Sequence, residues 1–154
     1  MTVKHVIITG ASGFIGSRLV QNYLERGVQV TAIVREPLKL SELHSPLLSV
    51  VRADFNEYST LADRLPTAEY DIFYDLAWGG YGSATNDFIA QIENIRPVCD
   101  AVVQAARLGC KRFLFSTSFS EYMISEDDEK THDMGAVCNV YGSAKAAARL
   151  LAQA

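Results

Sequence analysis

Three polar side chains in the last quarter of the chain could together move a proton. Tyr141 and Lys145 are four positions apart, so on a helix they share one face. A free tyrosine has a pKa of about 10, and a neighbouring ammonium group lowers that pKa by favouring the tyrosinate. Ser118 follows an apolar run, and its hydroxyl could hold a substrate oxygen while Tyr141 acts as acid or base. Because Tyr-x-x-x-Lys is a common pattern, the assignment depends on the elements around it.

Three glycines near the N-terminus suggest a second kind of chemistry. Gly10, Gly13 and Gly16 follow the apolar run 6–8 and precede a helical pattern, as in a dinucleotide-binding βαβ unit. The first glycine permits a tight turn, the second lets the backbone approach a pyrophosphate, and the third lets the helix pack close to the strand. The phosphates would then bind N–H groups at the helix N-terminus. The preceding strand and following helix distinguish this loop from an ordinary cluster of turn glycines.

The rest of the chain alternates strands with helices. Further strands are predicted at residues 28–34, 47–51, 72–77 and 112–117, and helices at 37–43, 59–65, 87–108 and 141–154. This alternation predicts an α/β fold with a Rossmann-like, doubly wound parallel sheet. One incomplete dinucleotide-binding domain is expected to span residues 1–154.

The helix at 87–108 contains a proline. Pro97 should kink it near residues 93–94, either as a simple irregularity or to present Asn94 towards an active site. Its apolar periodicity predicts one buried face, formed by Phe88, Ile92, Ile95, Cys99 and Val102.

Composition narrows the class of protein. The 154 residues are 49% hydrophobic and 21% charged, which is ordinary for one globular α/β domain. The net charge of −4 gives no reason to expect a nucleic-acid partner, and no apolar run approaches membrane-spanning length. Cys99, Cys110 and Cys138 lack metal-ligand spacing. We therefore expect a soluble, cytoplasmic protein with reduced thiols, no metal, and no nucleic-acid or membrane partner.

The glycine spacing and the Tyr–Lys pair together resemble a known family. The run Thr-Gly-Ala-Ser-Gly-Phe-Ile-Gly at 9–16 is similar to the short-chain dehydrogenase/reductase superfamily, and within it to the NAD-dependent epimerase/dehydratase family. The run Phe-Ser-Thr-Ser at 115–118, ahead of Tyr141 and Lys145, resembles that family's catalytic triad. The resemblance implies Ser118, Tyr141 and Lys145 as catalytic residues, with Asn94 completing a tetrad. Asn94 could instead be a solvent-exposed helix residue.

The same resemblance implies a set of cofactor contacts. Asp54 matches the aspartate that meets the adenine amino group, although it could simply cap a turn, and the pair 76–77 matches the strand end beside the cofactor. The implied cofactor-binding residues are Gly10, Ser12, Gly13, Phe14, Ile15, Gly16, Arg35, Asp54, Phe55, Leu76, Ala77, Ser116, Tyr141 and Lys145.

Arg35 bears on the choice of cofactor. NAD-preferring folds place an acidic residue at the end of the second strand, where this chain has Val34 followed by Arg35. A guanidinium can pair bidentately with a 2′-phosphate, which predicts NADP in preference to NAD. The pattern also resembles NADP-using members similar to dihydroflavonol reductases. Alternatively, Arg35 is a solvated surface residue, and Glu36 could compete for it or bind a ribose.

The resemblance implies hydride transfer at a sugar carbon of a nucleotide sugar. Sugar-nucleotide 4,6-dehydratases carry Asp-Glu after the catalytic Ser or Thr, whereas this chain has Phe119 and Ser120, which argues against a dehydratase. Arg35 favours a 4-ketoreductase over an epimerase, because net reduction uses NADPH. The alternatives are a non-catalytic NAD(P) sensor or scaffold, although such proteins usually lose the Tyr–Lys pair, and an inactive fragment of the enzyme.

The end of the chain carries further expectations. Enzymes of this branch are considerably longer, so we expect a fragment or truncated product that ends after the helix carrying Tyr141. The fifth strand should then lie at an open edge and favour a homo-oligomer. The acidic run at 126–129 is expected to be a solvated loop, or else a flap between two catalytic elements.

Overall fold

The computed structural model describes residues 2–121 and 139–154. In chain order the elements are β1 (His5–Thr9), α1 (Phe14–Glu25), β2 (Gln29–Val34), the 3-10 helix η1 (Pro37–Leu40), β3 (Leu48–Arg52), the 3-10 helix η2 (Phe55–Thr60), α2 (Leu61–Arg64), β4 (Ile72–Asp75), α3 (Phe88–Ile92), α4 (Ile95–Arg107), β5 (Arg112–Phe115) and α6 (Val140–Ala152). The acidic run at 126–129 and Cys138 lie outside the described residues.

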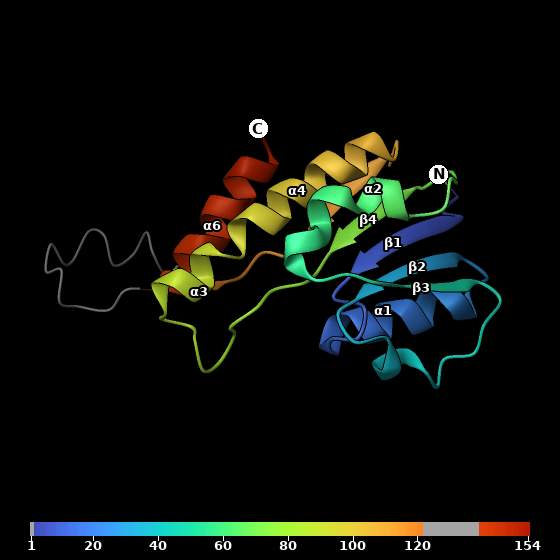
Figure 1. Ribbon diagram of the computed structural model, residues 1–154, viewed down its shortest axis with the longest axis horizontal. Coiled ribbons are helices and arrows are strands. Elements are labelled where there is room, and N and C mark those ends of the chain that lie inside the picture. The colour runs from blue at the N-terminus through green and yellow to red at the C-terminus, as the bar shows by residue number, and fades with distance from the viewer. Residues whose placement is uncertain (1, 122–138) are drawn as a thin grey trace, which may run out of the picture. The chain divides into compact units, whose positions relative to one another are not determined.

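Five parallel strands form one sheet in the order β3-β2-β1-β4-β5 (Figure 1). The central strand β1 pairs with β2 on one side and β4 on the other, so that Ile7 lies between Thr31 and Phe73. The order reverses between β1 and β4, and doubly wound folds bind their ligands at such a point, beyond the carboxyl ends of the strands. The predicted Rossmann-like fold is therefore confirmed.

Two compact units make up the chain. Met1–Ala77 with Asp100–Ser116 form the first, here called the sheet unit, and Trp78–Cys99 with Thr117–Ala154 form the second, here called the helical unit. The sheet unit contains all five strands, and the helical unit contains α3 and α6, which contact each other.

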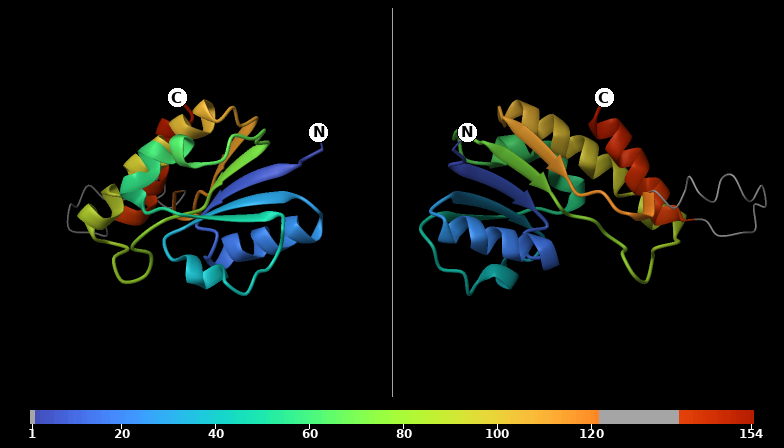
Figure 2. Two further views of the ribbon diagram at one scale, coloured as in Figure 1. Left: turned by 45° about the vertical axis from the view of Figure 1, so that its right-hand side comes forward. Right: turned by 180° about the vertical axis from the view of Figure 1, so that it is seen from behind.

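Alternating side chains of the sheet unit build a core on each face of the sheet. Val6 and Ile8 of β1 pack in one core with residues of α1, while Ile7 packs in the other core, on the second face of the sheet, with residues of η2 and α2. Figure 2 shows helices on both faces of the sheet. Residues 100–107 of α4 cover this second face as well. All three side chains are fully buried. Burial on both faces explains why the run 6–8 is continuously apolar rather than alternating with polar residues.

The helix predicted at 87–108 is interrupted at residues 93–94, the predicted position of the kink, but the structure has two separate helices instead of one kinked helix. α3 ends at Ile92 and α4 begins at Ile95. Pro97 has no N–H to donate to the carbonyl of Glu93, four positions earlier, so a continuous helix would lose a hydrogen bond there. Asn94 lies between the two helices, and its Nδ2 donates a hydrogen bond to the Ala90 carbonyl at 2.8 Å.

The buried face predicted for this segment is also wrong. Phe88 and Ile92 are more than half exposed, whereas the amide side chains of Gln91, Asn94 and Gln104 are buried. These amides make hydrogen bonds to backbone groups, which compensates for their removal from water. Apolar periodicity cannot detect such positions.

Several other boundaries differ from those predicted. The helix expected at 59–65 is the 3-10 helix η2 followed by the single turn α2, and the stretch from Pro37 is also a 3-10 helix. β4 and β5 each end two residues earlier than predicted, at Asp75 and Phe115. Ser118 therefore follows β5 by three residues instead of ending it.

The predicted edge position of β5 is confirmed, and Leu114 on this strand is 45% exposed.

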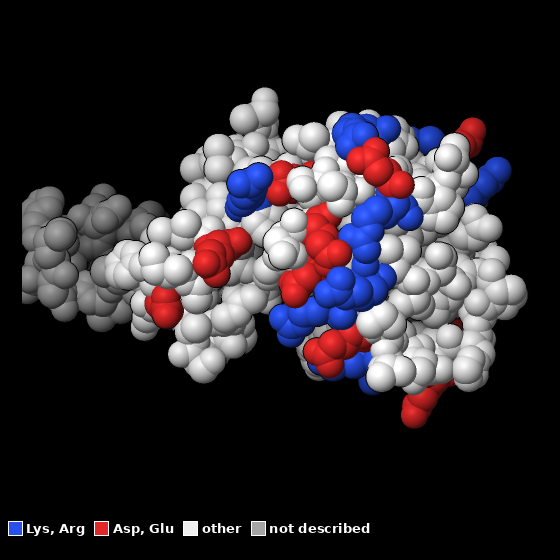
Figure 3. Space-filling model, in the orientation of Figure 1, with Lys and Arg blue, Asp and Glu red and all other residues white. Residues whose placement is uncertain are grey.

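Charged side chains of both signs are interspersed on the face shown in Figure 3. In the sheet unit, Glu57 accepts from both Arg52 and Arg64, and Arg107 pairs with Asp63 at 2.6 Å. Such exposed pairs neutralise one another locally and contribute little stability each. Within residues 2–121 and 139–154, no helix is both long and apolar enough to span a membrane.

Candidate functional site

The glycine loop between β1 and α1 is shaped by close backbone contacts. Gly10 has φ +62°, and a Cβ added there would lie 2.9 Å from the backbone nitrogen of Ala77. A Cβ on Gly16 would overlap the carbonyl oxygen of Gly10. The close approach that Gly16 permits is thus to the loop backbone, and not to the strand as predicted.

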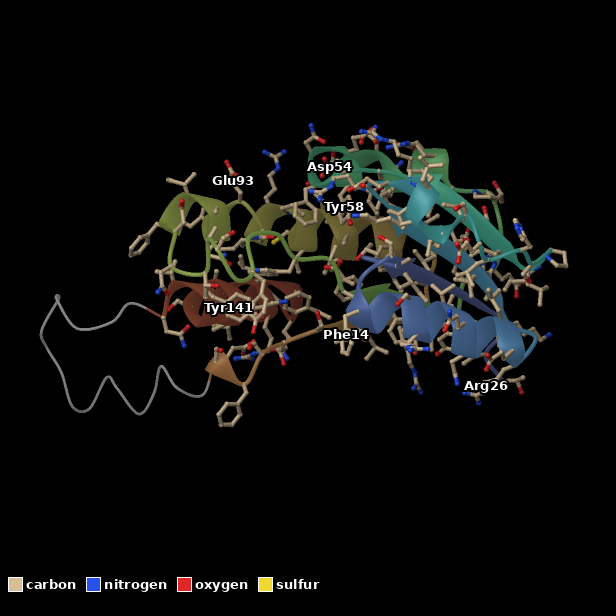
Figure 4. All side chains as sticks on the ribbon, turned by 90° about the horizontal axis from the view of Figure 1, so that it is seen from below. Phe14, Arg26, Asp54, Tyr58, Glu93 and Tyr141 are labelled. Carbon is tan, nitrogen blue, oxygen red and sulfur yellow. The ribbon has the colours of Figure 1, made fainter. Side chains whose placement is uncertain are left out.

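The loop leaves the start of α1 open. Gly13 is the N-cap residue and provides no side-chain hydrogen bond to the first turn. Phe14 and Ile15 in that turn are 93% and 61% exposed. Figure 4 shows Phe14 at the start of α1. The first N–H groups of a helix lack intrahelical partners and carry its partial positive charge. A tight glycine loop beside such an open helix start fits the pyrophosphate of a dinucleotide.

A buried polar pair, which sequence reasoning missed, lies beneath this loop. Thr9 donates to the carboxylate of Asp75 at 2.6 Å, and its hydroxyl accepts from the N–H groups of Leu76 and Ala77 at 3.1 and 3.3 Å. Thr9 and Asp75 are almost completely buried. The pair therefore fixes residues 76–77 beside the glycine loop. A charged residue ending an otherwise apolar strand was the available sequence signal.

Arg35 lies at the carboxyl edge of the sheet, directly after β2. Its side chain is 67% exposed, and its guanidinium is 3.9 Å from Glu36, which also pairs with Lys39 at 3.0 Å. The long distance and the second cation on Glu36 leave the guanidinium accessible to a ligand. The predicted competition by Glu36 is therefore present but weak.

Asp54 caps a turn, which is one of the two roles considered for it from the sequence. Its Oδ1 accepts from the N–H of Phe55 at 2.8 Å, and its own N–H donates to Glu57 at 2.8 Å. This backbone hydrogen bond from Asp54, helped by Arg52 and Arg64, lowers the pKa of Glu57. The capping box fixes the start of η2, where Asp54 and Phe55 follow β3 at the same edge of the sheet.

In the helical unit, Tyr141 and Lys145 share one side of α6. The side chain of Asn139 caps this helix by accepting from the Gly142 N–H at 2.9 Å, which places Tyr141 in its first turn. Lys145 is only 2% exposed, and its Nζ lies 3.9 Å from the centre of the Trp78 ring. The Tyr141 ring is 6.0 Å from that of Trp78 and 5.3 Å from that of Tyr81.

Asn94 is buried, so its alternative assignment as a solvent-exposed residue is wrong. Its Oδ1 accepts from the Gly79 N–H at 2.6 Å, and its Nδ2 donates to the Gly79 carbonyl at 3.2 Å. Gly79 directly follows Trp78 in the chain. Asn94 therefore holds the backbone beside the ring that contacts Tyr141 and Lys145.

Ser118 is connected to α6 through its neighbours. The Ser118 hydroxyl accepts from the Ser120 N–H at 3.2 Å, and the Ser120 carbonyl accepts from Asn139 at 2.8 Å. Glu121 bonds the Ser118 N–H at 3.4 Å and Arg149 of α6 at 2.8 Å. The segment carrying Ser118 therefore packs against the helix that carries Tyr141 and Lys145.

The predicted residues divide between the two units. Glycine-loop residues with Ser12, Arg35, Asp54, Phe55, Leu76, Ala77 and Ser116 belong to the sheet unit, and Asn94, Ser118, Tyr141 and Lys145 belong to the helical unit. Sequence reasoning missed four residues that connect the second group: Trp78, Gln91, Glu121 and Asn139. Trp78, Gln91 and Glu121 act through partners distant in the chain, whereas Asn139 stands at an N-cap position just before a predicted helix, which was the available sequence signal.

Comparison with known proteins places these features in a family. Residues 6–154 match the NAD dependent epimerase/dehydratase family. Dihydroflavonol 4-reductase of Arabidopsis thaliana is 30% identical over 139 residues, covering 83% of this chain and 36% of the plant enzyme. The Bordetella bronchiseptica enzyme WbmH, solved in complex with NAD+, has a TM-score of 0.76 at 20% identity, covering 99% of this chain and 52% of that one.

A further solved structure, MoeE5 in complex with UDP-glucose and NAD, has a TM-score of 0.69 at 26% identity. The similarity covers 96% of this chain and 48% of MoeE5. This chain therefore spans about half the length of the enzymes of known structure, and less of the plant reductase. The chain belongs to the NAD-dependent epimerase/dehydratase family.

Proposed function

We propose that the chain carries the cofactor-binding and proton-transfer residues of an NADP(H)-dependent oxidoreductase that interconverts a carbinol and a ketone. The observation that carries this proposal is the arrangement at the start of α6, where Tyr141 and the buried Lys145 contact the same tryptophan ring. A phenol held on the same side of a helix as a lysine is the pair of groups that general acid–base catalysis at a carbinol or ketone oxygen would use.

Each residue of the group has a distinct role in this proposal. Tyr141 delivers the proton to the ketone oxygen during reduction and removes it during oxidation. Ser118 donates a hydrogen bond to the same oxygen, and Lys145 binds the nicotinamide ribose and stabilises the ionised phenol. A nicotinamide held there would supply or accept the hydride. Asn94 acts through the backbone of Gly79, which its amide holds by two hydrogen bonds.

The dinucleotide would bind along the carboxyl edge of the sheet. Gly10, Gly13 and Gly16 and the start of α1 would hold the pyrophosphate, with Ser12, Phe14 and Ile15 beside it. Asp54 and Phe55 would meet the adenine, while Leu76, Ala77 and Ser116 would line the strand ends. The exposed guanidinium of Arg35 supports NADP as the preferred cofactor over NAD, because it can pair with a 2′-phosphate.

The proposed substrate is a nucleotide sugar, reduced or epimerised at a sugar carbon. UDP-glucose bound to MoeE5, which is 26% identical to this chain, supports this class. Phe119 and Ser120 stand where a 4,6-dehydratase would need acidic residues, so water elimination is not proposed. Arg35 favours a ketoreductase over an epimerase, since only the reductase consumes NADPH.

A second candidate is reduction of a ketone of the dihydroflavonol type. It is supported by the 30% identity to the plant reductase and by Tyr81, which is 75% exposed and borders Tyr141. An exposed aromatic ring beside the proton donor offers a stacking surface for a flat substrate. A non-catalytic NAD(P) sensor is less well supported, because such a protein has no need of both Tyr141 and Lys145.

Turnover of a substrate panel tests the proposal. NADPH oxidation is followed with keto-sugar nucleotides and with dihydroflavonols, using the parent protein and Tyr141→Phe. Loss of the phenol should lower kcat by about 10²- to 10⁴-fold without weakening NADPH binding. Unchanged turnover in Tyr141→Phe would refute the assignment and favour a sensor.

The open edge at β5 also leads us to propose a homo-oligomer, which light scattering measures directly.

A further inference from the structure

Trp78 contacts both members of the Tyr–Lys pair. The Lys145 ammonium lies over the indole face, 3.9 Å from the ring centre, and the Tyr141 ring meets the indole at 88° with centroids 6.0 Å apart. All three residues belong to the helical unit. No pattern in the sequence marks Trp78, which is far from Tyr141 in the chain.

A buried glutamine holds the indole in place. The Trp78 Nε1–H donates to Gln91 Oε1 at 2.9 Å, and Gln91 is fully buried. Its Nε2 donates in turn to the carbonyls of Gly80 and Ala84, at 3.1 and 2.8 Å. Gln91 therefore ties the ring to the backbone of the loop that follows it. A buried amide that satisfies three partners restrains all of them.

Asn94 restrains the other side of the same residue. It holds both backbone groups of Gly79, next to Trp78. Trp78 is thus fixed at its ring nitrogen and at its following peptide by two amides from the broken-helix segment. The buried amides of Gln91 and Asn94 satisfy backbone groups of the loop that follows Trp78, and both thereby support the position of its ring.

A lysine needs such support to act at one defined position. Its side chain has four rotatable bonds, and its ammonium is strongly hydrated in water. At 2% exposure Lys145 has lost nearly all contact with solvent, and an aromatic face attracts a cation more strongly once water is excluded. The indole ring therefore supplies an attractive surface that keeps the ammonium on the side of α6 where Tyr141 lies.

We propose that Trp78 is a positioning residue, whose indole face fixes the Lys145 ammonium beside Tyr141 and whose orientation is set by Gln91. This inference rests on the proposed function for its catalytic consequence, but the positioning itself can be measured without a substrate. Lys145 and Tyr141 contact the indole ring, and Tyr81 contacts Tyr141.

Nuclear magnetic resonance of the 154-residue chain tests the positioning directly. Methylene protons beside an ammonium that sits over an indole are shifted upfield by the ring current. We expect the Lys145 ε-protons to show this shift in the parent, less of it in Trp78→Phe, and none in Trp78→Leu. Because Trp78 is the only tryptophan in the sequence, a single indole N–H resonance reports its bond to Gln91, and Gln91→Leu should move that resonance.

Tyr81→Leu is the matched control, since Tyr81 contacts Tyr141 from the same loop and its replacement should leave the Lys145 protons unchanged. In the turnover assay, Trp78→Leu should lower kcat by about 2- to 30-fold, with Trp78→Phe intermediate and NADPH affinity little changed. Dispersed amide spectra establish that each variant is folded.

Ordinary chemical shifts for the Lys145 ε-protons in the parent would overturn the proposal. So would a Trp78→Leu variant with full kcat alongside an inactive Tyr141→Phe. The two proposals can fail separately. If Tyr141→Phe turns over normally, the proposed function is wrong, while the ring-current comparison still decides whether Trp78 positions Lys145.

Discussion

Replacing Arg35 with alanine should weaken NADPH binding and leave NADH binding unchanged. The guanidinium follows β2, its side chain is 67% exposed, and its distance to Glu36 is 3.9 Å. A hydrogen bond to a charged group contributes about 1.5–3 kcal/mol, which corresponds to about a 10- to 150-fold change in Kd. The 2′-phosphate is the one group that distinguishes the two cofactors at this end, so the whole effect should fall on NADPH.

Two neighbouring residues provide matched controls. Lys39→Ala removes another exposed cation that pairs with Glu36, and should alter NADPH affinity much less than Arg35→Ala does. Glu36→Gln removes the carboxylate that competes for Arg35 and should tighten NADPH binding by a small factor, because an exposed pair at 3.9 Å contributes little.

Fluorescence titration of both reduced cofactors measures these constants at two salt concentrations. The advantage of NADPH over NADH should shrink as salt rises, because the interaction is between exposed charges. Equal affinities of the parent for the two cofactors would refute the reasoning. An equal loss for both cofactors in Arg35→Ala would also refute it, since that result would mean that the substitution disturbs the fold and not a phosphate contact.

Three further perturbations test other parts of the structure. Gly16→Ala places a methyl group against the Gly10 carbonyl, so it should lower the free energy of unfolding by about 1–3 kcal/mol and weaken both cofactors equally in the same titration, unlike Ser17→Ala beside it. Lys145→Ala should impair both kcat and cofactor affinity, whereas Tyr141→Phe impairs kcat alone; steady-state kinetics with cofactor titration distinguishes them. Hydrogen bonds from Lys111 and from the backbone N–H of Lys4 hold the pKa of Asp71 at about 2. The stability that this lowered pKa provides is complete above the unfolded pKa of about 3.9 and is lost as the pH falls towards 2. Urea unfolding at pH 6 and at pH 2.5 measures the free energy of unfolding, which should fall by about 1–2 kcal/mol more in the parent than in Asp71→Asn. This range is discounted because the lysine partner is exposed to solvent.

The sheet could be predicted from the sequence because its signals are local. Val6, Ile7 and Ile8 form an apolar run of strand length, and the contact that requires a glycine at position 16 is with the backbone of Gly10 in the same loop. The capping box of Asp54 and Glu57 is equally local, since an acidic residue three positions after an N-cap is a recognisable pattern. In each case the partners that determine the structure are close neighbours in the chain.

The segment 87–108 shows why the remainder could not be predicted. Periodicity selects Phe88 and Ile92 as buried because they are apolar, but their positions are more than half exposed. Gln91 and Asn94 are buried because backbone groups at 79–84 need hydrogen-bond partners, and that need is created by a loop whose path is set by tertiary structure. The sequence does not indicate whether a polar side chain will be buried with such hydrogen-bond partners.

The two kinds of chemistry proposed for this chain differ in the same respect. Cofactor binding depends on what the backbone presents, namely tight turns and free N–H groups, and glycine spacing records those requirements directly. Proton transfer depends on how side chains from separate segments are held. Tyr141 and Lys145 can be placed on one face by their spacing, yet spacing does not fix the lysine's four rotatable bonds. Trp78 restrains them from one segment, and Gln91 in turn holds Trp78 from another. The motif therefore identifies the reacting groups, while the restraint on their geometry comes from residues outside it.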